Sequence, residues 1–190
     1  MHVLRSWGSV ARAIRPAIAV AALVGAARAS APNLESVQVQ PLALTPNGRR
    51  LVAVNTPDAV LEVYAVSPTG ALAGQRSIRV GLEPVSVALR TDNEAWVVNS
   101  LSDSVSIVDL DLGIVTKTLR TGDEPADVAF ARGRAFVTVS GEDRIEVYDA
   151  ADPAAAPTLI AIAGDAPRAL AVSPDGLVYC AVLHSGNRTT

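Results

Sequence analysis

Three loops carry the residues that could do chemistry in this sequence, because each combines a Gly-x-x-Pro step with nearby charged side chains. The candidate residues are Glu83, Asp123, Glu124, Asp165, Asp127 and Arg168. Carboxylate oxygens are the ligands that hard cations prefer. If the loops converge, these residues form a binding site for a cation or for a cationic group of a ligand. The alternative is that the acids are solvated loop charges, and that Gly and Pro only shape the turns.

The sequence contains few of the residue combinations that form catalytic sites. After residue 29 the only histidine is His184, which we expect in an exposed turn. One histidine cannot make a His-rich metal site, and a Ser-His-Asp arrangement would need a serine brought to it. Cys180 is the only cysteine, expected as a buried strand residue, and no Cys-x-x-Cys-His haem motif occurs. We therefore predict no catalytic residue, no metal centre and no cofactor, and the sequence favours a non-enzyme without deciding it.

The three loops recur at a nearly constant interval. Their prolines, Pro84, Pro125 and Pro167, are 41 and 42 residues apart within the pattern Gly-x-x-Pro-x-x-apolar-Ala-apolar. Between them, short stretches such as residues 105–109 and 145–149 alternate apolar and polar side chains, the period of a half-buried strand. Each unit of about 42 residues thus holds four short strands separated by turn residues, which is the content of one propeller blade.

Two further sets of residues occupy equivalent positions in the units. The aromatic residues Trp96, Phe136 and Tyr179 fall on second strands, where we expect them to pack between blades. Asp109 and Asp149 end equivalent third strands, and we expect them to cap turns rather than to act as a catalytic pair.

Several stretches resemble the YVTN family of β-propeller repeats. They are Trp96-Val97-Val98-Asn99, Val105-Ser106-Ile107-Val108-Asp109 and the turn Pro174-Asp175-Gly176. The resemblance covers about residues 37–190 and implies an all-β propeller of four-stranded blades, with about three and a half blades present. The units lie near 41–80, 81–121, 122–163 and 164–190. In that fold the Gly-x-x-Pro loops enter innermost strands and surround one mouth of the central channel. The sequence departs from the family where Val139 and Leu183 replace asparagine.

We expect the ring to be open, since a propeller closes with roughly 4–8 blades and the fourth unit stops before its third strand. Two hypotheses follow: the sequence is a fragment of a longer protein, or copies associate through open blade edges. The N-terminal segment 30–40 could supply the outer strand that family members lend to the final blade.

Residues 1–29 have the pattern of a secretory signal peptide. Arginines precede a short apolar run at residues 17–27, and Ala27-Arg28-Ala29 fits the cleavage site. The run is too short to cross a bilayer, so we expect export to the periplasm or medium without stable membrane insertion. The alternative is an uncleaved anchoring helix. Removing residues 1–29 moves the formal net charge from -3 to -7, and the body has no basic stretch, which argues against nucleic-acid binding.

The sequence therefore predicts an exported β-propeller that presents loops to an unidentified protein or small-molecule ligand. The resemblance implies two alternatives. One is the propeller part of a periplasmic redox protein linked to a cytochrome or quinone, and the other is a lactonase-like hydrolase.

Overall fold

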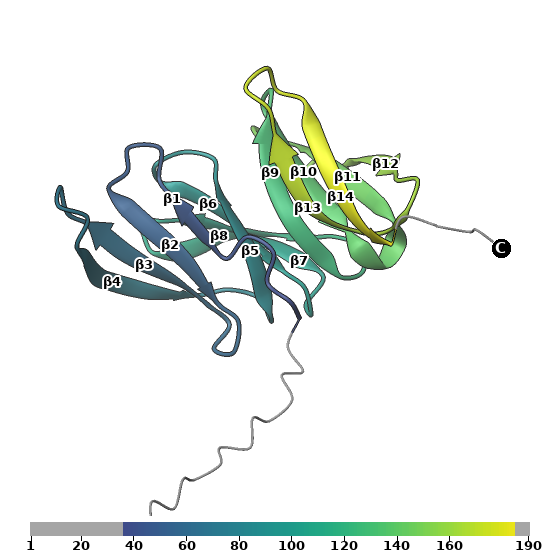
Figure 1. Cartoon of the computed structure of the whole chain (residues 1–190). Helices are drawn as coiled ribbons and strands as arrows, with labels where there is room; N and C mark the ends of the chain where they lie inside the picture. Colours follow the sequence, from purple (N-terminus) through teal and green to yellow (C-terminus); the bar gives the residue numbers. More distant parts are fainter. Residues whose placement is uncertain (1–35, 185–190) are drawn as a thin grey trace, which may run out of the picture. The chain divides into compact units, whose positions relative to one another are not determined.

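The computed structural model describes residues 36–184, and strands make up nearly all of their regular structure (Figure 1). Blade 1 contains β1 (Leu42–Leu44), β2 (Arg50–Asn55), β3 (Val60–Val66) and β4 (Leu72–Arg79). Blade 2 contains β5 (Pro84–Leu89), β6 (Glu94–Asn99), β7 (Ser104–Asp109) and β8 (Ile114–Arg120). Blade 3 contains β9 (Pro125–Ala131), β10 (Arg134–Val139), the 3-10 turn η1 (Ser140–Glu142), β11 (Arg144–Asp149) and β12 (Thr158–Ala161). Half-blade 4 contains β13 (Asp165–Val172) and β14 (Val178–His184).

Each blade is an antiparallel meander in which strands pair in chain order. The sheet orders are β1-β2-β3-β4, β5-β6-β7-β8, β9-β10-β11-β12 and β13-β14. The Gly-x-x-Pro prolines stand at the start of the first strands: Pro84 and Pro125 open β5 and β9, and Pro167 lies in β13. The predicted fold class, an all-β propeller with four-stranded blades, is therefore confirmed. Within residues 36–184, no helix is long and apolar enough to span a membrane.

The core lies between consecutive blades, because the middle strands of blade 2 bury side chains on both faces. Val97 of β6 belongs to the apolar cluster shared with blade 1, whereas its neighbours Trp96 and Val98 belong to the cluster shared with blade 3. A strand covered on both sides reads as a continuous apolar run rather than as an alternation. This explains why residues 95–98 are all apolar and fully buried.

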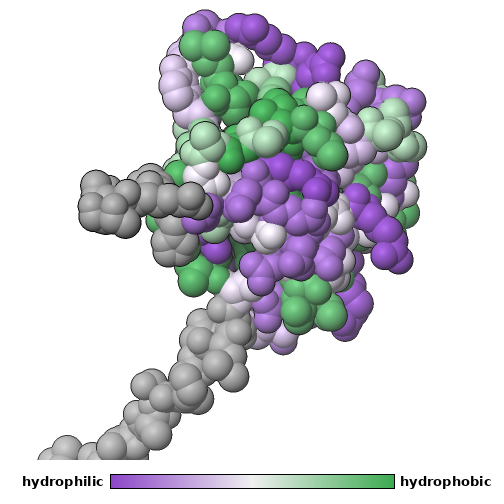
Figure 2. Space-filling view, turned by 90° about the vertical axis from the view of Figure 1, so that its right-hand side faces the viewer, coloured by the Kyte–Doolittle hydropathy of each residue, from purple (hydrophilic) through white to green (hydrophobic). Residues whose placement is uncertain are grey.

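Trp96 is the largest fully buried side chain and joins two blades as predicted. Its ring makes edge-to-face contacts with Phe130 at 5.4 Å and with Tyr148 at 6.5 Å between centroids, both in blade 3. Phe136 packs in part against the third apolar cluster. The expectation is wrong for Tyr179, which is 58% exposed because no described strand covers its side of β14. Figure 2 views the side on which β11, β12 and β14 lie, and apolar surface adjoins hydrophilic surface there.

The caps at the ends of the third strands are confirmed. Asp109 accepts hydrogen bonds from the backbone amides of Asp111 and Leu112 at 2.9 and 2.8 Å, and Asp149 accepts one from Ala151 at 2.8 Å. Both carboxylates therefore fix the turn that follows their strand.

The segment before β1 lies along the first strand of blade 2. The amide of Val39 donates to the Val85 carbonyl at 2.9 Å, and the amide of Val87 donates to the Gln40 carbonyl at 3.0 Å. Gln40 and Ser86 form a parallel bridge. The expected ring-closing role of segment 30–40 stays a prediction. The predicted signal peptide at 1–29 lies outside the described residues.

Candidate functional site

The Gly-x-x-Pro loops repeat one unusual backbone conformation. The residue before each proline, Glu83, Glu124 or Ala166, has a positive φ of 50°, 51° or 54°. A left-handed conformation at a residue other than glycine costs on the order of 1 kcal/mol and persists only when the surroundings impose it. The carbonyls of Glu83 and Glu124 accept hydrogen bonds from Ser100 and Ser140 at 2.9 and 3.0 Å, which supplies part of that constraint.

A pair of aspartates that the sequence reasoning missed supplies the rest. Asp103 accepts a hydrogen bond from the amide of Glu124 at 3.2 Å, and Asp143 accepts one from Ala166 at 2.8 Å. Each aspartate lies in the turn before the third strand of one blade and caps the loop of the next blade. A sequence signal for this role exists, because Asp103 and Asp143 occupy equivalent positions directly before β7 and β11. Blade 1 has Ala59 at that position.

The first glycine of the loop is required by a close approach. A Cβ atom placed on Gly81 would lie 2.5 Å from Ser102 Oγ and 2.6 Å from Asn99 Cγ. Asn99 is fully buried, and its side-chain amide donates hydrogen bonds to the hydroxyls of Ser104 and Ser106. Its side chain therefore cannot move away from an added Cβ without breaking these bonds. Gly81 therefore lets the loop pack directly on the end of β6.

Asp127 is the most enclosed of the predicted site residues, with 1% of its surface exposed. Its Oδ1 accepts hydrogen bonds from the Ser86 hydroxyl at 2.5 Å and the Val128 amide at 2.9 Å, and its Oδ2 accepts one from the Leu170 amide at 2.7 Å. Ser86 belongs to blade 2 and Leu170 to half-blade 4. One carboxylate therefore ties the first strands of three consecutive blades together.

Burial raises the pKa of Asp127 above its ordinary value of 3.8, because desolvation disfavours the charged form. The hydrogen bonds from Ser86, Leu170 and Val128 act in the opposite direction and are outweighed. A carboxylate that accepts three hydrogen bonds from neighbouring strands and is 1% exposed joins those strands in this structure.

Arg168 and Glu83 both hold the segment before β1. The guanidinium of Arg168 donates to the Val37 carbonyl at 2.7 Å. The hydroxyl and amide of Ser36 donate to Glu83 Oε2 at 2.6 and 3.2 Å. Gln38 donates to the Thr56 hydroxyl of blade 1 at 2.8 Å. Residues 36–40, called the N-terminal strap below, are thus held by three sheets.

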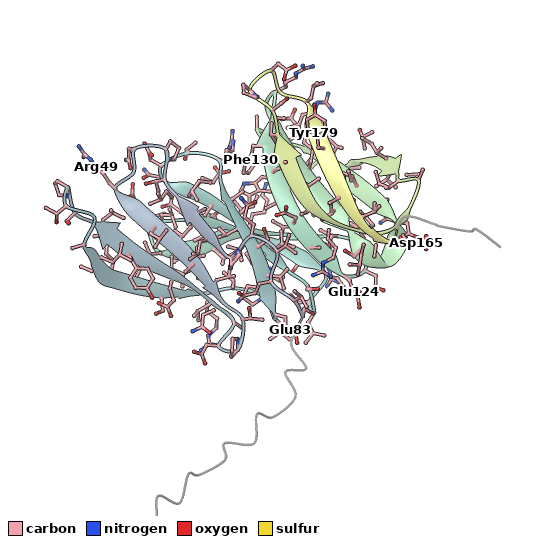
Figure 3. The ribbon with its side chains drawn as sticks, in the orientation of Figure 1. Arg49, Glu83, Glu124, Phe130, Asp165 and Tyr179 are labelled. Carbon is pink, nitrogen blue, oxygen red and sulfur yellow. The ribbon has the colours of Figure 1, made fainter. Side chains whose placement is uncertain are left out.

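The remaining candidates, Asp123, Glu124 and Asp165, are exposed, and their carboxylates accept no hydrogen bond from any described residue. Figure 3 shows Glu83, Glu124 and Asp165 at the same end of the sheets. Among residues 36–184, no three His, Cys, Asp or Glu side chains group closely enough to hold a metal ion. The structure therefore places these acids on one end of the blades but does not gather them around one point.

Blade 3 contains a second buried carboxylate. Glu146 accepts hydrogen bonds from Arg144 Nη2 at 2.7 Å, from the Tyr148 hydroxyl at 2.6 Å and from the Gly122 amide at 3.1 Å. Burial, followed by the hydrogen bond to Glu146, raises the pKa of Tyr148. This network fixes the Gly122 end of the loop to β11 and, like Asp127, has a structural role.

Cys180 and His184 both lie on β14. Cys180 is half-buried against the third apolar cluster, and burial raises the pKa of its thiol, so the thiol is less reactive than an ordinary one. His184 is the last residue of β14 and not part of a turn, which corrects the expectation from sequence. Its side chain lies outside the described part.

Comparison of whole folds identifies β-propellers as structural neighbours. A hydrazine synthase from Kuenenia stuttgartiensis aligns with a TM-score of 0.69 and 23% identity, over 83% of this chain and 46% of that one. A putative 6-phosphogluconolactonase from Bacteroides uniformis gives 0.61 and 22%, over 73% and 48%. The dihydro-heme d1 dehydrogenase NirN gives 0.60 and 18%, over 81% and 36%.

The chain spans less than half the length of each of these three proteins. No family model matches the sequence, and no curated protein matches it either. Likeness at this level of identity defines the fold. The chain is a β-propeller protein in its architecture, with blades joined through buried polar side chains.

Proposed function

We propose that this chain belongs to an exported β-propeller of the YVTN type that acts as a non-catalytic binding module. Its acidic loop end, defined as Asp123, Glu124 and Asp165, would meet a cationic ligand or partner. The observation that carries the proposal is a contrast. The inner carboxylate of Asp127 is buried and accepts three hydrogen bonds, whereas the loop carboxylates are exposed and accept no hydrogen bond from any described residue.

The loop conformation supports a recognition role. Positive φ angles recur before the prolines of all three loops, and a capping aspartate from the preceding blade holds the second and third loops. Ligand contacts in proteins concentrate on loops that a rigid scaffold positions. Preformed loops bind with a smaller ordering cost than mobile ones.

Titration with two named cations tests the proposal. We expect full-length protein to bind hexalysine or Ca²⁺, measured by calorimetry at low salt. Binding should weaken at least about tenfold in the triple variant Asp123→Asn, Glu124→Gln, Asp165→Asn. A matched control neutralises three acids in turns outside these loops: Asp92, Asp111 and Asp152. Equal losses in both variants, or no binding by the wild type, would reject a specific acidic loop end.

Export is the second part of the proposal, and it rests on the Arg-rich start, the apolar run and the Ala-x-Ala site within residues 1–29. Expression in a bacterium followed by intact-mass analysis of the periplasmic fraction should give a mature N-terminus at Ser30 or within a few residues of it. A chain that retains residues 1–29 would reject cleavage.

Open blade edges also suggest self-association. Among the described strands β14 pairs only with β13, and Leu177, Tyr179 and Leu183 are 48%, 58% and 61% exposed. Sedimentation of the exported chain across a concentration series would test this, and a monomer at all concentrations would reject it.

The alternatives make different predictions. A redox role is supported by the names of two structural neighbours, hydrazine synthase and dihydro-heme d1 dehydrogenase. It predicts a haem or quinone signal in the visible or ultraviolet spectrum of the full natural protein. A lactonase role is supported by the 6-phosphogluconolactonase-like neighbours. It predicts hydrolysis of 6-phosphogluconolactone, for which Arg168 and the loop acids are the only candidates in the described chain.

A further inference from the structure

A surface pocket of about 400 Å³ lies beside the outer strand of blade 2, away from the loops that the proposed function uses. One wall is the consecutive run 117–120 of β8, and the opposite wall is the loop between β11 and β12. Its lining residues are Lys117, Thr118, Leu119, Arg120, Tyr148, Pro153, Ala154, Ala155, Ala156 and Pro157.

The pocket exists because one blade has a longer loop than its neighbour. The loop between β7 and β8 has four residues, 110–113, whereas the loop between β11 and β12 has eight, 150–157. In repeat proteins, insertions confined to one unit map to loops that are commonly used for binding. The added residues are Pro and Ala, whose small side chains leave the space open.

The equivalent place between blades 1 and 2 is closed. Arg76 of β4 pairs with Val63 as Lys117 of β8 pairs with Ile107, so the two basic residues are equivalent. Arg76 Nη1 donates to the Asp111 carbonyl of the short loop at 3.0 Å and packs on Gly113. Lys117 donates no hydrogen bond to the loop of residues 150–157, although both line the open space. The space between β4 and the loop of blade 2 is therefore filled by Arg76, whereas the equivalent space between β8 and the loop of blade 3 is open. This open space is called the slot below.

The slot is cationic in an acidic protein. Lys117 and Arg120 are exposed, neither forms an ion pair with a described residue, and no acidic side chain lines the pocket. The chain as a whole has a formal net charge of -3. Two cations without partners in such a chain favour a ligand with carboxylates.

The wall formed by β8 also offers backbone groups. β8 is the last strand of its sheet, so among the described residues one of its edges has unpaired amides and carbonyls. An extended peptide can add to such an edge through main-chain hydrogen bonds, while side-chain contacts give specificity. Tyr148 forms the floor of the pocket, and its hydroxyl oxygen lies 3.3 Å from the Arg120 carbonyl.

We propose that this slot binds an extended peptide segment with acidic side chains, which adds to the edge of β8 and pairs its carboxylates with Lys117 and Arg120. The site is separate from the loop end in the proposed function and recognises the opposite charge, so either proposal can fail alone.

The test uses fluorescein-labelled Val-Glu-Val-Val-Glu-Val and the full chain, read by fluorescence anisotropy. The two acids are three residues apart, so in an added strand they point to opposite faces, as Lys117 and Arg120 do on β8. We expect saturable binding that weakens at least about tenfold in Lys117→Glu/Arg120→Glu and on deletion of residues 154–156. The matched control, Arg49→Glu/Arg79→Glu, changes the net charge equally at exposed arginines elsewhere and should change affinity less than about twofold. Circular dichroism of each variant confirms folding.

Two further probes fix the occupant. Val-Lys-Val-Val-Lys-Val should not bind the slot, and N-methylation of alternate residues in the acidic peptide should abolish binding by blocking strand pairing. Equal affinity of the N-methylated peptide, or full competition by free glutamate at matched carboxylate concentration, would overturn strand addition in favour of a small carboxylate ligand. Failure of the acidic peptide to bind, or equal losses in the control variant, would overturn the site.

Discussion

The Ser86 hydroxyl donates a hydrogen bond of 2.5 Å to the Asp127 carboxylate across the junction of blades 2 and 3. The same carboxylate receives the Leu170 amide of half-blade 4 at 2.7 Å. Apolar clusters join neighbouring blades and include Val85, Val87 and Val128 of the first strands. The shared acceptor adds a polar link between those first strands. Asp127 was predicted as a ligand-binding candidate, and in the structure its carboxylate joins strands of three blades.

Loss of the joining carboxylate should destabilise the protein. In Asp127→Ala the Ser86 hydroxyl and the amides of Val128 and Leu170 lose their acceptor, and unpaired buried donors cost about 1–3 kcal/mol each before relaxation. We expect the free energy of unfolding in urea to fall by about 3 kcal/mol. Asp123→Ala removes an exposed acid and should change it by less than about 0.5 kcal/mol. Similar values for both variants would contradict the assigned role.

The raised pKa of Asp127 also gives a pH dependence. Between the ordinary value of 3.8 and the raised folded value, the folded state binds more protons than the unfolded state. The stabilising contribution is therefore fully present below about pH 3.8 and is lost as the pH rises through the folded pKa. Urea unfolding between pH 4 and pH 7.5 should show the wild type gaining stability relative to Asp127→Asn as the pH falls. A constant difference, or a gain in the opposite direction, would show that burial does not dominate.

The close approach at Gly81 predicts a glycine requirement. In Gly81→Ala the new Cβ would meet Ser102 and the buried Asn99 at 2.5 and 2.6 Å, so the loop or the end of β6 must shift. We expect a loss of about 1–3 kcal/mol in thermal or urea unfolding. Gly74→Ala is the control, because the nearest atom to its Cβ is Tyr64 Cε1 at 4.0 Å. A neutral Gly81→Ala would show that the loop moves freely.

The hold of Arg168 on the N-terminal strap can be followed by hydrogen exchange. Arg168→Ala removes the donor to the Val37 carbonyl and should weaken the pairing of the strap with β5. We expect faster exchange at the amides of Val39 and Val87, with unchanged exchange in β6 and β7. Arg79→Ala, at an exposed arginine on β4, serves as the comparison. Unchanged protection at Val39 would mean that the β5 contacts alone hold the strap.

Much of the fold could be predicted because turn residues and strand alternation recur in each unit of the sequence. The Gly-x-x-Pro spacing locates the start of blade 2, blade 3 and half-blade 4, and Asp109 and Asp149 cap the turns as their positions indicate. These features depend on residues close together in the sequence, where turn chemistry and alternation decide the structure.

The site was less predictable because its contacts cross between blades. Sequence position places Asp127 near the channel but does not say that Ser86 and Leu170, 41 and 43 residues away, enclose it. The capping role of Asp103 and Asp143 could not be predicted for the same reason, because the amides that they accept from lie in the next unit. Tyr179 shows the reverse case: the aromatic column predicts packing, but burial depends on a neighbouring sheet.

The eight-residue loop between β11 and β12 has a consequence for how such proteins diversify. Its extra length changes the surface beside β8, but the strand pairing of β9, β10 and β11 and the apolar cluster that they share are kept. Successive copies of a duplicated unit can thus acquire separate specificities by lengthening one connection, at little risk to folding. The same connection in the other blades is a natural place to graft a foreign recognition sequence.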